Sequence, residues 1–473
     1  MSWNTVVGLE IHAQMATQSK MFCACRRQAG AVPNSNICPV CVGWPGALPV
    51  LQGEAVRCAM RAAICLGCDI QELSRFDRKN YFYPDLPKGY QISQFYHPYA
   101  LGGSIPFTRD DGSAAVLPLV RIHMEEDAGK SSHEEDGTSR IDLNRCSSPL
   151  LEIVSEPLLM SGTEAASCVR SVRALLRWVG VCDGDMEKGN LRCDVNVSVM
   201  PEEAVEFGTR AELKNLNSFV SIERSVVVET ARQIEVIEGG GQVVQETRLW
   251  DQDKEVTASM RGKEDSPDYR YFPEPDLPVV WITEDDIQQQ SGSLPEMPED
   301  RRQRWLKEYD FPEREVVPLL SRRENGDYLE SLILEGVKPA SASNWFRGEI
   351  LKQLNEREER IEVFPVTAQS LALVIKAVEE DRISVATGKE LLQKSLDKGS
   401  DLKTLLESTD EQVQDEGALG EWVDQVLSEN EDAVNKIRGG DDRAIGFLVG
   451  QVMKLSKGQA HPKKVQELMR ARI

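Results

Sequence analysis

The sequence predicts an α+β protein: a large mixed domain with a β-sheet core, then an all-helical domain and a small helical tail. Two observations support this. In the first part of the chain, short segments that alternate apolar and polar residues are interspersed with helical patterns. Beyond about residue 294 the apolar spacing is helical throughout. We therefore place the domains at 1–293, 294–408 and 409–473.

The predicted elements of the first domain are bounded by recognisable turn and cap residues. The expected strands are Thr5–Ala13, Ala115–Glu125, Leu150–Ser155, Cys193–Met200, Ala211–Asn215 and Val243–Trp250, and the expected helices are Gln52–Leu66, Gly162–Val179 and Ser218–Gly239. Ser161 precedes the second helix as a predicted N-cap, and Gly239 to Gly241 stop the third.

A proline-rich segment separates the mixed domain from the helices. Pro273, Pro275 and Pro278 exclude a helix and a central strand there, so we expect the chain to leave the first domain at this point. The expected helices beyond it are Glu299–Tyr309, Gly326–Leu334, Ser341–Leu354 and Ala368–Glu380.

Composition narrows the class of protein. The 473 residues are 41% hydrophobic and 28% charged, with a net charge of −22, which argues against a protein that coats nucleic acid non-specifically. No apolar run is long enough to span a membrane and no signal peptide is evident, so we expect a cytoplasmic protein with reduced thiols and no membrane partner. Residues 437–473 hold 8 Lys/Arg against 3 Asp/Glu, which suits a local contact with a polyanion.

Four of the predicted strands share one design, an apolar face and a face of carboxylate or amide side chains. The polar faces carry Glu10 and His12, then Arg121, His123, Glu125 and Asp127, then Glu152, and finally Asp194, Asn196 and Ser198. In one sheet, so many carboxylates would require a cation, and oxygen ligands with one imidazole suit Mg²⁺ working with a phosphate-bearing substrate such as ATP. Alternatively, these faces look into solvent on separate sheets.

Two tight cysteine pairs predict a metal site. Cys23 and Cys25, followed by Cys38 and Cys41, form a CxC and a CxxC within 23–41. Four thiolates at this spacing are typical of structural Zn²⁺. The alternatives are a redox CxxC, for which no βαβ context follows, and four unrelated buried thiols. We expect the other cysteines to be core residues.

The segment Arg75–Gln94 interleaves basic and aromatic residues with two prolines, and we interpret it as an extended loop. Lys79 and Lys88 are candidates to meet phosphates, and the aromatics to stack on a base or to pack inward. No P-loop or Rossmann glycine motif occurs, and no GxSxG elbow, so we expect neither of these nucleotide-binding folds nor a covalent hydrolase.

These segments together resemble the B subunits of the glutamyl/aspartyl-tRNA amidotransferases over almost the whole chain. The motifs that carry the resemblance are VGLEIHAQ, CAC…CPVC with PGALPVL, FDRKNYFYPDLPKGYQISQ, RIHMEEDAGK, PLLEIVSEP, LRCDVNVSV, ELKNLNSF, QETRLWD, DYRYFPEPDLP and FLVGQVMKLSKGQAHP. The run Met186–Leu191 departs slightly from the family pattern, and the cysteine knuckle is not universal in the family.

The resemblance implies a heterotrimer in which this chain uses ATP and Mg²⁺ to phosphorylate the side-chain carboxylate of misacylated Glu-tRNA(Gln) or Asp-tRNA(Asn). An amidase partner then supplies ammonia from glutamine through a channel, and a small third partner ties the amidase to this chain. The implied fold is a cradle domain, a helical domain and a tail that grips tRNA.

The resemblance also assigns residues. The implied Mg²⁺/ATP and ammonia-delivery site consists of Glu10, His12, Glu125, Glu152 and Asp194, with the first four as magnesium ligands. The expected nucleotide-binding residues are Lys79, Lys88, Asn196 and Lys214, and the expected tRNA-binding residues are Lys454, Lys457, Lys463 and Lys464.

Two other interpretations are open: an archaeal-type paralogue specific for Glu-tRNA(Gln), and a non-catalytic tRNA-binding scaffold. The direct run from Pro278 into the helices leaves no room for the inserted domain of the first. The carboxylates argue against the second.

Overall fold

The computed structural model describes residues 2–28, 30–134, 136–260, 269–409, 416–438, 443–456, 460 and 462–473. It divides into two compact units, Met1–Met297 and Pro298–Ile473. Sheets with helices make up the first unit, and the elements described in the second are helices, which confirms the predicted α+β class. The finer boundaries at 293 and 408 stay predictions.

The first unit is built on one large mixed sheet. From edge to edge its strands are β15 (Val256–Ser259), β14 (Thr247–Asp251), β13 (Ala211–Leu216), β12 (Leu191–Pro201), β1 (Trp3–Gln14), β10 (Pro149–Ser155), β7 (Ala114–Glu126), β5 (Ala100–Leu101) and β2 (Asp69–Ile70), with β11 (Leu158–Leu159) on β1 and β6 (Ser104–Thr108) on β7. In this sheet, β13 and β14 pair in parallel. The four strands with the predicted carboxylate faces, β12, β1, β10 and β7, are consecutive neighbours.

Strand register gives this sheet two chemically different faces. Ile11 pairs with Cys193 on one side and Ile153 on the other, and all three side chains are buried. Residues one step along each strand point to the opposite face, where the carboxylates lie. The apolar face carries the core of the unit.

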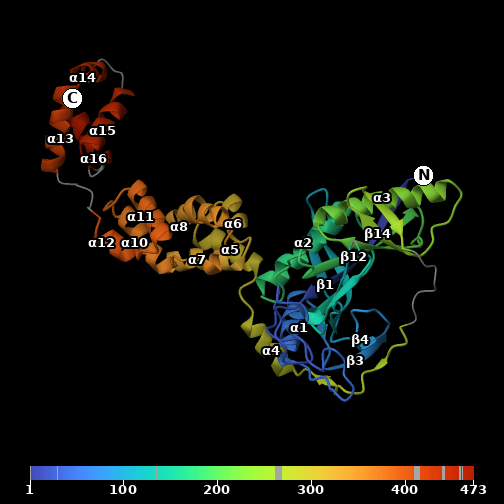
Figure 1. The fold of residues 1–473 in the computed structure, drawn as a ribbon. Helices are drawn as coiled ribbons and strands as arrows, with labels where there is room; N and C mark the ends of the chain where they lie inside the picture. The colour runs from blue at the N-terminus through green and yellow to red at the C-terminus, as the bar shows by residue number, and fades with distance from the viewer. Residues whose placement is uncertain are drawn as a thin grey trace. The chain divides into compact units, whose positions relative to one another are not determined.

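Helices α2 (Gly162–Trp178) and α3 (Phe219–Glu238) lie side by side along the sheet (Figure 1). Ser161 is the N-cap of α2, as predicted, and it forms a capping box with Glu164; Gly240, with φ +78°, follows the end of α3. At Gly162 a Cβ atom would stand 2.3 Å from the carbonyl oxygen of Glu223. The two helices therefore approach closely because α2 begins with glycine. Helix α1 (Gly53–Cys65) is also as predicted.

The prediction that Arg75–Gln94 is one extended loop was wrong. Strands β3 (Leu73–Asn80) and β4 (Tyr90–His97) form an antiparallel hairpin, and only the segment between them is a loop. β16 (Phe272–Pro273) and β17 (Val280–Trp281) add to β3. The strands escape detection in the sequence because their buried positions include polar residues such as Asp77, Ser93 and Gln94, which hide the period-two signal.

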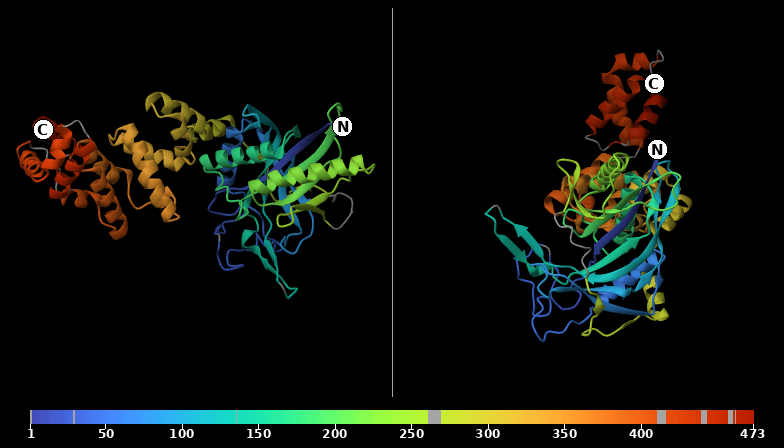
Figure 2. Two further views of the ribbon diagram at one scale, coloured as in Figure 1. Left: turned by 90° about the horizontal axis from the view of Figure 1, so that it is seen from above. Right: turned by 90° about the vertical axis from the view of Figure 1, so that its right-hand side faces the viewer.

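Smaller differences occur elsewhere in the first unit. The strand predicted over Val243–Trp250 begins only at Thr247, and helix α4 (Glu284–Ser293) was not predicted. β8 (Lys130–His133) and β9 (Ser139–Asp142) form a hairpin that stands out from the unit, and a 3₁₀ turn follows at Leu143–Arg145 (Figure 2).

The second unit contains helices in two groups. The first comprises α5 (Pro298–Glu308), α6 (Glu313–Leu319), α7 (Arg323–Leu334), α8 (Pro339–Trp345), α9 (Leu351–Glu356), α10 (Ala368–Glu379), α11 (Val385–Lys398) and α12 (Leu402–Glu407). The second comprises α13 (Glu416–Glu429), α14 (Glu431–Arg438), α15 (Arg443–Leu455) and α16 (Pro462–Arg472).

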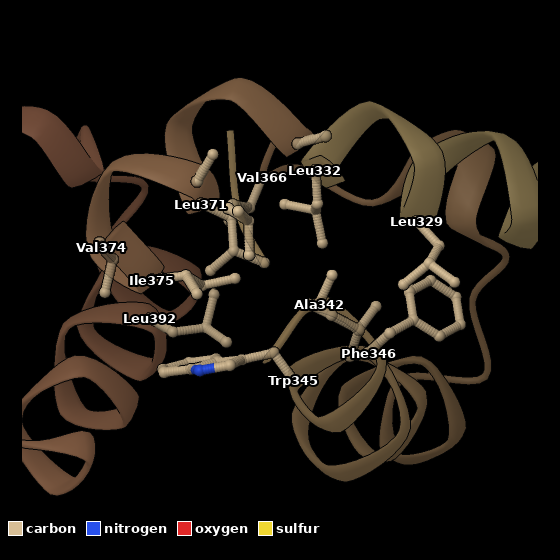
Figure 3. Packing of buried hydrophobic residues seen from close by; sticks show 14 of the residues in the cluster. Leu329, Leu332, Ala342, Trp345, Phe346, Val366, Leu371, Val374, Ile375 and Leu392 are labelled. Atoms are coloured by element: carbon tan, nitrogen blue, oxygen red, sulfur yellow. The ribbon is translucent and has the colours of Figure 1, made fainter. Parts of the chain in front are cut away.

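Each group has its own apolar cluster. In the first, Trp345 and Leu392 meet Leu371 and Ile375 (Figure 3). The helix predicted over Ser341–Leu354 is interrupted there by a π-helical stretch at Phe346–Ile350 and a new helix begins after it. Among the described residues, no helix is long and apolar enough to cross a membrane.

Candidate active site

The polar face of the central sheet gathers the predicted carboxylates into one cluster. His12 pairs with Glu152 across β1 and β10, and Glu152 pairs with His123 across β10 and β7. Glu10 pairs with Asp194 across β1 and β12. The sheet therefore brings side chains from four separate sequence segments together. We call Glu10, His12, Glu125, Glu152 and Asp194 the acidic cluster.

His12 lies at the centre of the acidic cluster. Its Nε2 atom is 3.4 Å from Glu152 Oε2, 3.5 Å from Glu125 Oε1 and 3.9 Å from Glu10 Oε1. Ligand atoms of His12, Glu125 and Glu152 lie within 4.8 Å of one another, and so do those of Glu10, His12 and Asp194. The five predicted residues are thus brought together, with His12 shared by both groups.

Burial makes the acidic cluster electrostatically costly. It raises the pKa of Glu10 to about 7, and the negative charges of Glu152 and Asp194 add to that rise. Burial alone would lower the pKa of His12, but the hydrogen bond and charge of Glu152, together with Glu125, raise it to about 9. The carboxylates thus rely on imidazolium charge for compensation.

A divalent cation fits this donor set. Carboxylate oxygens with one imidazole nitrogen are suitable ligands for Mg²⁺. A bound cation would also take over the charge compensation that the imidazolium of His12 otherwise provides. Two groups of ligand atoms could hold such an ion: His12 with Glu125 and Glu152, and His12 with Glu10 and Asp194.

Lysines border the acidic cluster. Lys214 Nζ lies 2.5 Å from Asp194 Oδ2 and 2.9 Å from Glu212 Oε1, and these charges raise its pKa against the effect of burial. Lys79 Nζ lies 5.0 Å from the ring centroid of Tyr269. Burial opposes its charge, but Glu125 and Glu152 raise the pKa of Lys79 above its usual value.

The other two predicted nucleotide-binding residues are placed differently. Lys88 forms an ion pair with Glu126, whose Oε1 atom also accepts from the backbone N–H of Ile92 at 2.9 Å. Ile92 and Ser93, neighbours in β4 (Tyr90–His97), contact Glu126 and Glu125 respectively, so Lys88 lies beside the acidic cluster and not in it. Asn196 is half-buried, two residues along β12 from Asp194 and opposite Glu212.

Strand β4 covers part of the acidic cluster and supplies residues that sequence reasoning missed. Ser93 Oγ donates to Glu125 Oε2 at 3.3 Å, and Gln94 Oε1 accepts from the backbone N–H of Met124 at 3.0 Å. No pattern in the sequence signals these residues, because the polar buried positions of β4 make the segment resemble a loop.

His123 is also absent from the predicted site, although it alternates with Glu125 on the same strand face. Its Nε2 atom lies 3.1 Å from Glu152 Oε2. Its Nδ1 atom is buried and has no hydrogen-bond partner within the described part of the chain. The alternation that selects Glu125 is a sufficient signal for His123 too.

A second candidate metal site lies in the 23–41 segment. The sulfur atoms of the four cysteines, Cys23, Cys25, Cys38 and Cys41, all lie within 4.8 Å of one another. Cys41 Sγ accepts from the backbone N–H of Cys38 at 3.0 Å. The hydrogen bond with Cys23, aided by that N–H, lowers the pKa of Cys41 to about 4.

Lys20 adds a reason to interpret the four thiols as ligands. Its side chain is fully buried, with Nζ 3.5 Å from Cys41 Sγ and 3.4 Å from the carbonyl oxygen of Leu143. A buried ammonium group requires negative charge close by. Four thiolates around Zn²⁺ carry a net charge of −2, so the surroundings fit a structural zinc ion.

The predicted tRNA-binding lysines lie in the last two helices as far as they are described. Lys454 is exposed in the last turn of α15, and Lys463 is exposed and Lys464 half-buried in the first turn of α16. Lys457 lies outside the described residues.

Comparison with known proteins gives consistent matches. Residues 5–288 match the family described as the GatB/GatE catalytic domain, and residues 327–473 match the GatB domain. The chain is 45% identical, over the full length of both proteins, to the B subunit of the aspartyl/glutamyl-tRNA(Asn/Gln) amidotransferase of Trichlorobacter lovleyi. The B subunits from Thermodesulfovibrio yellowstonii and Alkalilimnicola ehrlichii are 43% and 45% identical, covering 99% and 100% of each chain.

Proposed function

The chain belongs to the family of B subunits of the aspartyl/glutamyl-tRNA(Asn/Gln) amidotransferases, and on that premise we propose that it activates the side-chain carboxylate of misacylated Glu-tRNA(Gln) or Asp-tRNA(Asn) with ATP. One carboxylate oxygen attacks the γ-phosphorus of ATP and ADP leaves. Ammonia then attacks the carbonyl carbon of the acyl phosphate and inorganic phosphate leaves, which yields the amide.

The observation that carries the proposal is the acidic cluster. The carboxylates of Glu10, Glu125 and Glu152 each lie within 4 Å of His12 Nε2 and so crowd one another, which is costly on a purely structural sheet face. Bound Mg²⁺ would neutralise the charge of a transferring phosphoryl group. Glu10, His12, Glu125 and Glu152 are the proposed holders of the ion.

The lysines have a distinct part in the proposal. Lys79 and Lys214 each bring a persistent positive charge to the border of the acidic cluster, where phosphate oxygens of ATP would otherwise meet carboxylates. Asn196 adds an amide on the same face. Lys88 forms an ion pair with Glu126, and we assign it to the wall of the site, where it shapes the opening through which the nucleotide enters.

β3 and β4 provide the cover of the site. Ser93 fixes Glu125, and Gln91 Nε2 donates to the backbone carbonyl of Glu126. An acyl phosphate is lost to hydrolysis where water reaches it, so a cover that excludes water protects the intermediate.

The other parts of the proposal concern metal, partners and tRNA. The four cysteines hold structural Zn²⁺, an amidase partner supplies ammonia from glutamine, and a small third partner joins the amidase to this chain. Lys454, Lys457, Lys463 and Lys464 contact phosphates of tRNA, a role that suits lysines at the basic end of an acidic chain. The carbon–nitrogen ligase activity resides in the assembled trimer.

The test uses the reconstituted trimer with Glu-tRNA(Gln), Asp-tRNA(Asn), ATP, Mg²⁺ and glutamine. We expect ADP and amidated tRNA to form in equal amounts, and Glu125→Gln to lower the formation of both by about 10³-fold. Glu202→Gln, at an exposed turn after β12, is the control and should change neither. Full ADP formation by the Glu125→Gln trimer would contradict the assigned site.

A further inference from the structure

His123 lies beside the acidic cluster and has no part in the proposed function. Its side chain is buried, with 3% of the residue exposed, and its Nε2 atom lies 3.1 Å from Glu152 Oε2. Among the described residues, His123 belongs to neither group of possible ligand atoms that lie within 4.8 Å of one another. It therefore meets the acidic cluster through Glu152 and not as one of the ligands.

Strand register fixes this contact. In their antiparallel pair, His123 of β7 is directly opposite Glu152 of β10, and His12 of β1 is directly opposite Glu152 on its other side. Directly opposite residues of a sheet have Cβ atoms about 4.5–5.5 Å apart. Both imidazoles make their closest approach to the same oxygen, Glu152 Oε2. The carboxylate is thus held between two histidines.

Glu152 is the acceptor in both contacts. Burial alone would raise the pKa of Glu152, but the charge of His123 and the hydrogen bonds with His12 and His123 hold it well below its usual value. An ionised carboxylate has no proton to donate. The proton of the contact at 3.1 Å is therefore on the imidazole, and His123 donates through Nε2.

The second nitrogen of His123 shows that its position is costly. Its Nδ1 atom is buried and has no hydrogen-bond partner in the part of the chain that the structure describes. A buried polar atom without a partner costs free energy, because it has lost its hydrogen bonds to water. An apolar side chain at this place would avoid that cost. The imidazole is therefore best explained by a use for its Nε2 donor.

His12 cannot replace this donor once a cation is bound. An imidazole nitrogen that binds a metal ion carries no proton. If His12 binds the ion through Nε2, the nitrogen that faces the carboxylates, it can no longer donate to Glu152. Among the described residues, the ion pairs of Glu152 are those with His12 and His123. His123 is then the donor that remains on Glu152.

We propose that His123 is a positioning residue, which holds the carboxylate of Glu152 in the orientation that a divalent cation requires. This inference rests on the proposed function, in which Glu152 is a ligand of Mg²⁺. Hydrogen bonds that orient ligating side chains typically contribute a factor of about 10–100 to metal affinity. In this role His123 binds no metal ion and transfers no proton.

Two amide substitutions separate the two nitrogens of His123. The amide nitrogen of glutamine is as many bonds from Cβ as Nε2 of histidine, and that of asparagine as many as Nδ1. His123→Gln therefore keeps a donor toward Glu152, whereas His123→Asn loses it. His123→Leu also lacks the donor, and it has no polar atom to bury, so it should fold at least as well.

Mn²⁺ is the probe of the site, because it takes the same kinds of ligand as Mg²⁺. The reconstituted trimer is titrated with Mn²⁺, and the EPR signal of the free ion measures the dissociation constant. We expect His123→Asn and His123→Leu to raise this constant about 10–100-fold, and His123→Gln to raise it by less than about threefold.

The dependence of amidation on Mg²⁺ distinguishes positioning from chemistry. For His123→Asn, the Mg²⁺ concentration that gives half-maximal amidation should rise about 10–100-fold. At saturating Mg²⁺, kcat should return to within about threefold of that of the unaltered trimer. A large loss of kcat at every Mg²⁺ concentration would mean that His123 takes part in the chemical step, and would overturn the inference.

His133→Asn is the matched control, because His133 is exposed in β8, where its Nδ1 atom lies 2.8 Å from Ser139 Oγ. It should change neither Mn²⁺ affinity nor the dependence on Mg²⁺. Melting temperatures verify that each variant is folded. A lower melting temperature with unchanged Mn²⁺ affinity in His123→Asn and His123→Leu would make His123 a purely structural residue.

Equal losses of Mn²⁺ affinity in His123→Gln and His123→Asn would also contradict the inference, since only the first keeps the donor. Failure of the proposed function would look different. The unaltered trimer would then bind no Mn²⁺ that Glu125→Gln removes, and the role of His123 would fall with it.

Discussion

Two of the carboxylate environments in the first unit contrast sharply. Glu229, in α3, is fully buried and receives hydrogen bonds from Arg232, Gln233 and Thr257, with Arg248 Nε 3.3 Å from its Oε2 atom. The acidic cluster instead places several carboxylates around His12. Hydrogen-bond donors therefore surround the carboxylate of Glu229, whereas carboxylate acceptors surround His12.

The pKa values record this difference. Burial would raise the pKa of Glu229, but the hydrogen bonds from Arg232, Gln233 and Thr257 lower it. Burial and neighbouring carboxylates raise the pKa of Glu10 to about 7. A carboxylate that serves the fold is therefore surrounded by donors and counter-charges, whereas the carboxylates of Glu10, Glu125 and Glu152 crowd one another around a single imidazole.

The largest expected effect is on activity. Glu125→Gln should lower ATP-dependent amidation by the trimer by about 10³-fold, because it removes one charge from the proposed magnesium site. It should not lower the melting temperature, since it also relieves repulsion within the acidic cluster. The measurements are single-turnover amidation and calorimetry. A strongly destabilised Glu125→Gln variant would mean that Glu125 stabilises the fold as Glu229 does.

The opposite pattern is expected for Glu229→Gln. Removing the carboxylate leaves Arg232 and Arg248 without their shared partner, which should lower the free energy of unfolding by about 3 kcal/mol. Urea titration of the isolated chain measures it. The folded fraction should amidate tRNA at the normal rate at low temperature, whereas a selective loss of activity would mean that this environment is not purely structural.

Magnesium should stabilise the unaltered protein. A ligand present at about 100 times its dissociation constant adds about 2.7 kcal/mol to stability by mass action. We expect Mg²⁺ to raise the melting temperature of the unaltered protein and of Glu229→Gln, and to have little effect on Glu125→Gln. Equal stabilisation of all three by Mg²⁺ would place the ion elsewhere.

Lys20 offers a third case, a buried cation that requires thiolates. We expect Lys20→Met to weaken zinc retention and to destabilise the zinc-loaded protein by about 1–3 kcal/mol, because the ammonium group contacts a sulfur that carries charge. After chelation the destabilisation should become smaller, because Cys41, whose pKa is lowered to about 4, is then the thiolate left to compensate the lysine. Zinc release to a colorimetric chelator and melting of both forms measure this. A metal-independent effect would refute the pairing.

The smallest expected effect is on pH dependence. The folded-state pKa of Glu229 lies below its ordinary value of 4.5, so its stabilisation is present above that value and is lost as pH falls through the lowered pKa. The difference in stability between the unaltered protein and Glu229→Gln should therefore be constant from about pH 8 to about pH 5 and shrink below that. Melting curves across this range test the sign, since a gap that widens on acidification would contradict it.

Much of the acidic cluster was predictable because alternation along a strand is a local property. Glu10 and His12 had to face away from Leu9 and Ile11 wherever the strand lay, and Glu152 away from Leu151. The capping box of α2 and the two cysteine pairs were equally local signals. These features follow from residues a few positions apart.

The tertiary structure decided which of these faces meet. Nothing in the sequence says that Glu10 pairs with Asp194, or that β4 returns to place Ser93 on Glu125. Lys20 and Cys41 come together through the fold of an irregular segment. Such contacts depend on strand order, register and loop closure over long sequence separations, which are settled by the packing of the whole unit and not by any local pattern.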